Sequence, residues 1–246
     1  MTAATATPTA KAETDPLGFD FVLDRRHPVA DQIYDSLKAA IVQVKLLPRT
    51  SISESRMCRH FGVSRTPVRA AILRLSEEGL IDVYPQQGSY VAPIRLADIH
   101  DGHFIRKSLE LSILTEAAAR WTPEMSRQAR DIVARGEAAI QAGDVEAFHV
   151  ADEDFHHAFT GFADRPGVWP AILQAKTRLS RFIRLISHII SNAERLPVVI
   201  DEHLAVLDAL DRGDAEEARA RLDYHLDKIF KLFDQVPDPY RPYLTD

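Results

Sequence analysis

The first hundred residues alternate between helical and extended hydrophobic patterns. Ile33, Leu37 and Ile41 recur at four-residue steps and predict an amphipathic helix over Val29–Val44. A short second helix is expected between a capping serine, Ser53, and His60. A third helix is expected after the turn Gly62-Val63-Ser64, and the apolar positions Ile72, Leu73, Leu75 and Leu80 follow that turn along the chain.

The pattern then changes to that of two short strands. Gly79 ends the third helix, and the strand-forming residues after it lie on either side of Pro85-Gln86-Gln87-Gly88, which reads as the turn of a hairpin. The order helix, helix, helix, hairpin predicts a winged helix-turn-helix over residues 25–94. The first 24 residues, rich in Ala, Thr and Pro, are interpreted as a flexible leader.

The remainder of the chain is predicted to be helical. Pro93 makes the segment Ala92–Arg95 a short linker. Proline and glycine residues then separate six helices without a strand, so the fold class is mainly α, with an all-α bundle over residues 98–235. Asp144 and Asp214 each follow a glycine and are expected to cap helices. The expected helices are 98–120, 124–141, 144–161, 168–191, about 195–211 and 214–234.

Composition and charge support two domains in a soluble, cytoplasmic protein. The chain has 246 residues, a single cysteine and a net charge of -6. Residues 21–94 carry 10 Lys/Arg against 7 Asp/Glu, whereas residues 95–246 carry 19 against 26. The N-terminal domain is therefore basic within an acidic chain, as expected if one end binds DNA. No apolar run is long enough for a membrane span, and the N-terminus lacks a signal peptide's apolar core.

The segment from Gly62 to Arg69, Gly-Val-Ser-Arg-Thr-Pro-Val-Arg, followed by Gly79-Leu80, resembles the signature of the GntR transcription regulators. The resemblance covers about residues 29–92. Arg65 and Arg69 are expected to contact bases in the major groove, and Ser64 and Thr66 to contact phosphates. Gln87 and Gly88 would bring the wing to the minor groove. Arg25-Arg26-His27, before the first helix, is either a phosphate contact or a solvated turn.

One polar constellation lies within the predicted bundle. Asp152 and His156 are four residues apart and share a helix face, while His203 and His225 lie on two later helices. Three imidazoles and a carboxylate suit one divalent ion, Zn first and Ni or Mn next. Because the chain has 10 histidines, an accidental pairing is the alternative.

The same four residues resemble the metal pattern of the FCD-type ligand-binding domain in the FadR subfamily of these regulators, and the six-helix count is similar to its VanR-like subgroup. The resemblance implies that Asp152, His156, His203 and His225 are metal ligands. It also draws attention to Arg106-Lys107-Ser108-Leu109-Glu110. Arg106 either binds the carboxylate of a small organic acid or merely pairs with Glu110. Arg178 and His188 are further candidates for effector binding.

Together these features predict a ligand-responsive transcription regulator. The resemblance to the family implies that it is a repressor. It would bind palindromic, double-stranded operator DNA as a homodimer and respond to a small carboxylate. Two alternatives remain. The metal itself is the signal, or the chain is a metalloenzyme fused to a DNA-binding module. Against the second, no separate general base or nucleophile is evident in the sequence.

Overall fold

The computed structural model describes residue 19, residues 21–189 and residues 192–246. The side chains of residues 188, 189, 192, 193 and 234 are outside this description. The chain divides into two compact units, one containing Lys45–Ala92 with the preceding residues up to Ile41, the other Pro93–Asp246 with Val42–Val44.

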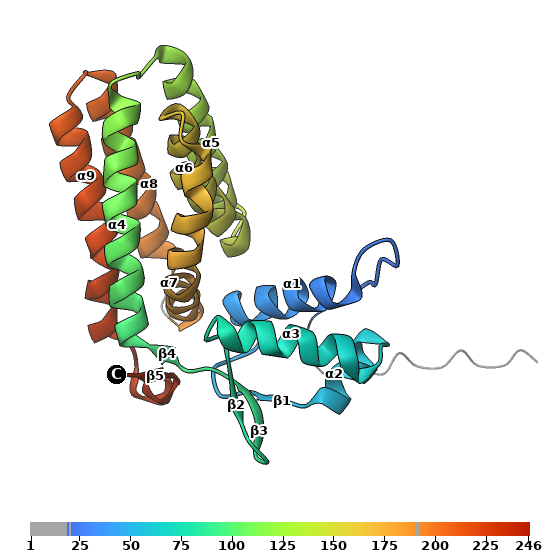
Figure 1. Cartoon of the computed structure of the whole chain (residues 1–246). Coiled ribbons are helices and arrows are strands. Elements are labelled where there is room, and N and C mark those ends of the chain that lie inside the picture. Colours follow the sequence, from blue (N-terminus) through green and yellow to red (C-terminus); the bar gives the residue numbers. More distant parts are fainter. Residues whose placement is uncertain (1–18, 20, 190–191) are drawn as a thin grey trace, which may run out of the picture. The chain divides into compact units, whose positions relative to one another are not determined.

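The first unit is a winged helix-turn-helix (Figure 1). Its elements are α1 (Val29–Val42), β1 (Ser51–Ile52), α2 (Glu54–Phe61), α3 (Arg65–Glu77), β2 (Ile81–Tyr84) and β3 (Gly88–Val91). The three strands form an antiparallel sheet in the order β1-β3-β2. The strand β1 was absent from the sequence prediction, because two residues are too few to show a period-2 pattern. The core is formed by fully buried side chains of the helices and the sheet, among them Ile33, Leu37, Ile41, Met57, Leu75, Leu80 and Ile81.

The turn between α2 and α3 matches the sequence at Ser53 and Gly62, but the cap expected from the Ser64 side chain is absent. Ser53 caps α2 by accepting a hydrogen bond from the backbone N–H of Arg56. Gly62 adopts a left-handed conformation (φ 66°), which side chains with a Cβ rarely adopt. Ser64 occupies the N-cap of α3, but its hydroxyl makes no capping hydrogen bond. Pro67 lies in the first turn of α3, where its missing N–H costs nothing.

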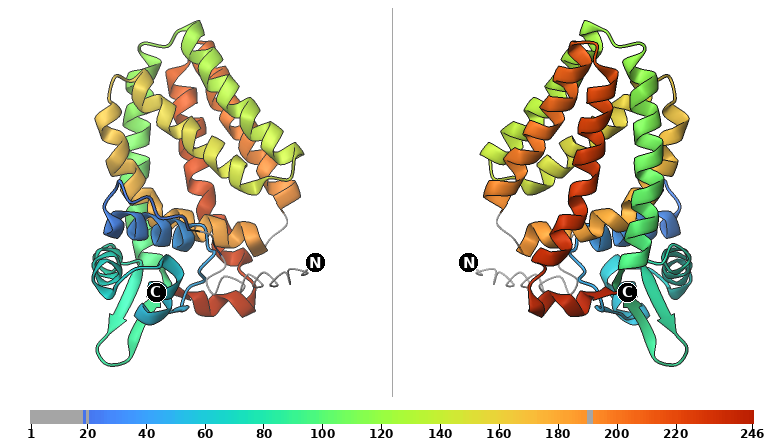
Figure 2. Two further views of the ribbon diagram at one scale, coloured as in Figure 1. Left: turned by 90° about the vertical axis from the view of Figure 1, so that its right-hand side faces the viewer. Right: turned by 90° about the vertical axis from the view of Figure 1, so that its left-hand side faces the viewer.

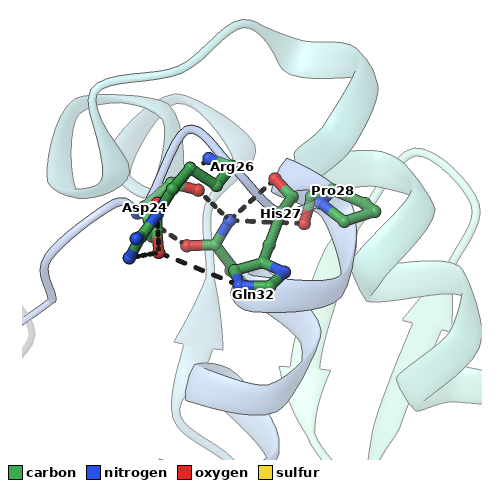
Figure 3. A network of polar contacts seen from close by, with 5 residues as sticks. All are labelled: Asp24, Arg26, His27, Pro28 and Gln32. Carbon is green, nitrogen blue, oxygen red and sulfur yellow. Dashed lines mark hydrogen bonds and ion pairs between the residues drawn. The ribbon is translucent and has the colours of Figure 1, made fainter.

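A polar network precedes α1 (Figure 3). The Gln32 amide donates to the backbone carbonyls of Asp24 (2.7 Å) and His27 (3.0 Å) and accepts from the Asp24 N–H (2.8 Å). The Asp24 carboxylate also pairs with Arg26 at 2.7 Å. The segment Arg25–His27 is thus a turn that is fastened to α1 by Gln32 and Asp24.

The second unit is an α-helical bundle (Figures 1 and 2). Its α-helices are α4 (Leu96–Ala118), α5 (Pro123–Gln141), α6 (Val145–Phe162), α7 (Trp169–Ile189), α8 (Asn192–Asp211) and α9 (Ala215–Asp227). A short 3₁₀ turn, η1 (Pro166–Val168), precedes α7. Helix α5 packs against α6 and α8, and α4 packs against α7 and α9. No described helix has both the length and the apolar character needed to cross a membrane.

Local sequence signals account for several helix ends in this unit. Asp144 and Asp214 cap α6 and α9 by accepting from backbone N–H groups three residues later, both at 2.9 Å. Gly102 permits close packing of α4 on α7, because a Cβ there would lie 2.5 Å from the Ala175 carbonyl oxygen. The absence of a Cβ at Gly102 thus allows the backbones of α4 and α7 to approach each other closely at this point.

Two expectations for this unit were wrong. The last helix was expected to continue to residue 234, but α9 ends at Asp227 and is followed by the 3₁₀ segments η2 (Lys228–Gln235) and η3 (Asp238–Tyr243). The C-terminal region was also expected to lack strands, whereas β4 (Ile94–Arg95) pairs in parallel with β5 (Leu244–Thr245). Apolar residues three apart satisfy both helix types, and two-residue strands show no period.

Candidate functional site

The predicted DNA-contacting residues lie at the surface of the first unit. Ser64, Arg65 and Thr66 are exposed at the beginning of α3, and the hydroxyl of Ser64 is not used in capping. Gln87 and Gly88 are exposed at the tip of the β2–β3 hairpin, where Gly88 has a φ of 112°. The structure thus leaves these side chains and the wing backbone accessible to a ligand.

Arg69, one turn beyond Arg65, is also exposed but is not alone. Its Nε lies 2.7 Å from Glu54 Oε1, at the start of α2. One donor of the Arg69 guanidinium, Nε, is therefore already bound to a carboxylate. The two terminal nitrogens of the fork remain available for a bidentate contact.

The second unit brings the four predicted metal ligands together. One ligand atom from each of Asp152, His156, His203 and His225 can be chosen so that all lie within 4.8 Å of one another. Ligand atoms about 2.1 Å from a common ion lie about 3–4 Å apart, so a small contraction would complete the shell. The four side chains come from α6, α8 and α9.

The donor atoms are oriented toward a shared centre. Asp152 Oδ1 lies 3.7 Å from His203 Nε2 and 4.0 Å from His156 Nε2. His203 is 2% exposed and stacks on Phe155, and its Nε2 is buried without a hydrogen-bond partner among the described residues. A buried imidazole nitrogen in this state costs free energy unless something coordinates it. The residues present therefore fit a bound cation.

Two carboxylates hold the imidazoles from behind. Glu110 Oε2 lies 2.6 Å from His156 Nδ1, and Glu202 Oε2 lies 2.8 Å from His225 Nδ1. When Nδ1 carries the proton and donates it to the carboxylate, Nε2 keeps a lone pair that can accept an N–H or coordinate an ion. This arrangement of carboxylate, histidine and ion is common at protein metal sites.

The carboxylates have cationic partners of their own. Arg106 Nε donates to Glu110 Oε1 at 2.6 Å, and Arg106 Nη2 lies 3.0 Å from His156 Nε2. Lys228 forms an ion pair with Glu202. Lys176, which is 4% exposed, lies 3.5 Å from Asp152 Oδ2 and thus leaves Oδ1 toward the histidines. Arg106 thus pairs with Glu110 and also contacts His156, one of the four predicted metal ligands.

The electrostatics of the cluster favour the protonation states that bind a cation. Burial lowers the pKa of His156 to about 4, although Glu110 acts to raise it. Burial, together with His225, holds the pKa of His203 well below its usual range. Burial raises the pKa of Asp152, but Lys176 and the histidines outweigh it and keep that pKa well below normal. At neutral pH His156 and His203 are neutral and Asp152 is ionised, as metal coordination requires.

A cavity of about 350 Å³ adjoins the cluster, and Arg106, Asp152 and His225 are among the residues that line it. Its volume falls in the usual range for small-molecule sites. Arg178 is not among the lining residues and forms an ion pair with Asp98 at 2.8 Å. His188, the other predicted effector residue, has its side chain outside the described part of the chain. Of the three predicted effector residues, the structure brings Arg106 to the cavity.

Comparisons with known proteins agree with both units. Residues 29–91 match the family model described as bacterial regulatory proteins, gntR family, and residues 101–228 match the FCD domain. The chain is 32% identical over 214 residues to the HTH-type transcriptional repressor RspR of Escherichia coli K12, covering 87% of this chain and 92% of the relative. The chain belongs to the GntR family.

Other relatives place the regulator in the same group. It is 26% identical over 201 residues to the probable D-xylose utilization operon transcriptional repressor of Paenarthrobacter nicotinovorans, covering 82% of this chain and 87% of the relative. The structure of E. coli McbR/YncC has the same fold, with a TM-score of 0.71, 23% identity, and coverage of 85% of this chain and 98% of that one. This GntR-family chain is a DNA-binding transcriptional regulator and not an enzyme.

Sequence reasoning missed several residues of this regulator's FCD domain. Lys176 lies at the cluster, Arg195 lines the cavity, and Glu202 holds His225, one of the predicted ligands. Glu202 directly precedes His203, and Glu110 follows Arg106 by one turn, so both were visible as neighbours of predicted residues. Lys176 and Arg195 carry no sequence signal beyond their position on an amphipathic helix.

Proposed function

We propose that this GntR-family regulator binds one divalent metal ion per chain, Zn first and Ni or Mn next, and that a small organic acid acts as its effector at the same site. The metal would be held by Asp152 Oδ1 and the histidine Nε2 atoms. The single observation that carries the proposal is the convergence of these four side chains beside a cavity. A bound ion supplies a coordination point for carboxylate oxygens.

Arg106 is the proposed anchor for the effector carboxylate. It lines the cavity and reaches His156, so a carboxylate next to the ion would also lie near a guanidinium. Its Nε is held by Glu110, which leaves donors of the fork for the acid. In this arrangement the pair with Glu110 positions Arg106 and does not compete with effector binding.

The DNA-binding unit is proposed to meet a palindromic operator as part of a homodimer, since a two-fold protein matches a two-fold site. Exposed apolar side chains on two neighbouring helices of the second unit support self-association. Phe104 is 73% exposed on α4, next to the exposed Ile105, and Leu173 is exposed on α7, which packs against α4. A Phe104→Glu variant is expected to sediment as a monomer where the wild type sediments as a dimer.

The proposed sense of regulation is repression relieved by the acid. Support comes from two relatives that are named repressors, the E. coli RspR and the Paenarthrobacter xylose-operon regulator. For relief to occur, the acid must bind the DNA-free arrangement more tightly than the DNA-bound one. The cavity beside the metal cluster favours an organic signal over the metal alone.

The test compares wild type with His203→Ala and, as a matched control, with His157→Ala, an exposed histidine on α6. Wild type and control are expected to retain about one metal ion per chain, and small carboxylic acids should raise their melting temperature only when metal is loaded. His203→Ala should lose both responses. If metal alone alters operator binding and no acid has an effect, the metal is the signal. Absence of metal from all three proteins would contradict the proposal.

A further inference from the structure

The cavity wall contains a cation whose charge is not balanced by an ion pair. Arg195, on α8, is partly buried and lines the cavity, and its guanidinium donates to Ser187 Oγ at 3.3 Å. Among the described residues no carboxylate forms an ion pair with it. Two other cations of the wall, Arg106 and Lys228, form ion pairs with Glu110 and Glu202.

An unpaired guanidinium in a partly buried wall is energetically costly. Burial lowers the pKa of Arg195, while the charges of Asp152 and Glu202 act to raise it. An arginine nevertheless remains protonated in proteins, so the charge persists in the cavity wall. An anion in the cavity would remove this cost and would gain a planar, two-donor contact.

A second unsatisfied group lies in the same wall. His149, 8% exposed, precedes Asp152 by one turn of α6, and its Nε2 is buried without a hydrogen-bond partner among the described residues. Burial lowers the pKa of His149 to about 4, and Arg184 and Arg195 contribute in the same direction. The imidazole is thus neutral near Arg195 and has a nitrogen free to bond a ligand oxygen.

These two residues are separate from the metal ligands. Arg195 precedes His203 by eight residues on α8, which corresponds to about 12 Å along the helix axis. The arginine side chain covers part of that offset, and the remainder can be covered by a short carbon chain. Groups that can bind an acidic group are therefore present in two places: Arg106 beside the proposed ion, and Arg195 with His149 farther along the cavity.

We infer that the effector has two acidic ends: a carboxylate bound at the ion and Arg106, and a second anionic group, carboxylate or phosphate, bound by Arg195 and His149. This inference rests on the proposed metal-dependent effector site and specifies the class of acid that fits it. A compact hydroxy acid with an anionic tail would give Arg195 an ion-pair partner and His149 a hydrogen-bond partner. The same acid with an apolar tail would leave Arg195 without an ion pair.

The test uses acids that share one head group. Calorimetric titrations of the zinc-loaded full-length protein compare 2-hydroxyvalerate, 2-hydroxyglutarate and 3-phosphoglycerate, whose tails are neutral, carboxylate and phosphate respectively. Wild type is expected to bind at least one of the two anionic-tailed acids about tenfold or more tightly than 2-hydroxyvalerate. Whichever anionic tail binds better identifies the second group.

Variants of Arg195 and His149 then test whether these side chains cause the preference for an anionic tail. Arg195→Gln should abolish the preference while leaving 2-hydroxyvalerate binding and metal content unchanged, and Arg195→Lys should retain part of it. His149→Phe should reduce it several-fold. Arg178→Gln is the control, because Arg178 pairs with Asp98 and does not line the cavity.

Equal binding of all three acids to wild type, or an undiminished preference in a folded Arg195→Gln protein, would overturn the inference and leave the proposed function standing. Failure of the zinc-loaded protein to bind any of the acids would overturn both. Metal content and the melting curve of each variant, measured beside the titrations, distinguish a lost contact from a lost fold.

Discussion

The two units of this chain place their functional polar groups in opposite surroundings. In the winged helix-turn-helix, Arg65, Thr66 and Gln87 are exposed, and the core beneath them is apolar. In the FCD domain, His156, His203 and Glu110 are each less than 5% exposed and are part of the helical core. In the first unit, substitutions of the predicted functional side chains should therefore leave folding stability unchanged. In the second unit, the same kind of substitution should also reduce folding stability, so function and stability are coupled there.

The largest effect is expected where this coupling is strongest, at Glu110. Glu110→Gln removes the charge that pairs with Arg106 and the acceptor of His156, both of which are buried. Breaking one partner of a buried pair costs about 3–5 kcal/mol, and loss of a carboxylate behind a ligand histidine weakens metal binding about 10- to 100-fold. Urea unfolding and a competitive zinc titration measure the two effects.

The matched control for this variant is Glu116→Gln on the same helix. Glu116 is exposed and pairs with Arg165 at 2.9 Å. Its loss should change the free energy of unfolding by less than about 1 kcal/mol and leave zinc affinity unchanged. Equal losses in the two variants would show that burial of the polar cluster does not couple stability to metal binding.

A smaller but still large effect is expected from pH, through His149. Burial holds its pKa at about 4 in the folded protein, against an ordinary value of 6.5. The unfolded chain therefore binds the proton first as pH falls. The stability contributed by the neutral imidazole is fully present above pH 6.5 and is lost between pH 6.5 and 4, on the order of 3 kcal/mol in total.

Metal-free protein tests this prediction most directly. Because His149→Phe cannot titrate at this position, its unfolding free energy should fall less steeply from pH 6.5 to 4 than that of wild type. His157→Phe, which removes an exposed histidine from the same helix, should retain the wild-type slope. A wild-type slope in both variants would show that His149 is not the group responsible.

The coupling also explains which parts of the site were predictable from sequence. Asp152 and His156 share a helix face by spacing alone, and the helix-turn-helix signals at Ser53 and Gly62 are local. Arg195 and Lys176 reach the site because α8 and α7 turn particular faces toward α6. Helix rotation and crossing are set by packing of the whole core, and periodicity in one helix does not contain them.

The end of α9 was also predicted wrongly, because the helix ends at Asp227 and not at residue 234. Leu226, Ile229, Phe230 and Phe233 follow the i, i+3, i+4, i+7 spacing of an α-helix, so the sequence pattern favours a longer α9, whereas the structure has the 3₁₀ segment η2 there. The distinction matters because Lys228 and Ile229 of η2 line the cavity. Where tertiary contacts choose between two local structures, the local pattern is insufficient.

In the exposed unit, function should be lost without loss of stability. Arg65→Ala is expected to cost about 1–3 kcal/mol of operator-binding free energy, measured by mobility-shift titration, with the melting temperature and zinc content unchanged. Arg74→Ala is the control, because Arg74 pairs with Asp31 at 2.5 Å and lies over the Tyr34 ring. A melting temperature that falls markedly in Arg65→Ala would show that this exposed side chain also stabilises the fold.

The smallest and most discriminating effect concerns Arg69 and its partner Glu54. Arg69→Ala should weaken operator binding without changing metal content. Glu54→Gln should instead strengthen it a few-fold, because it releases Arg69 Nε from the 2.7 Å pair and removes a negative charge near the phosphates. Opposite signs in the two mobility-shift titrations would show that Arg69 contacts DNA and that Glu54 competes for it. Weaker binding in both variants would show instead that DNA recognition uses the intact ion pair as a unit, so that even in the exposed unit one contact depends on internal structure.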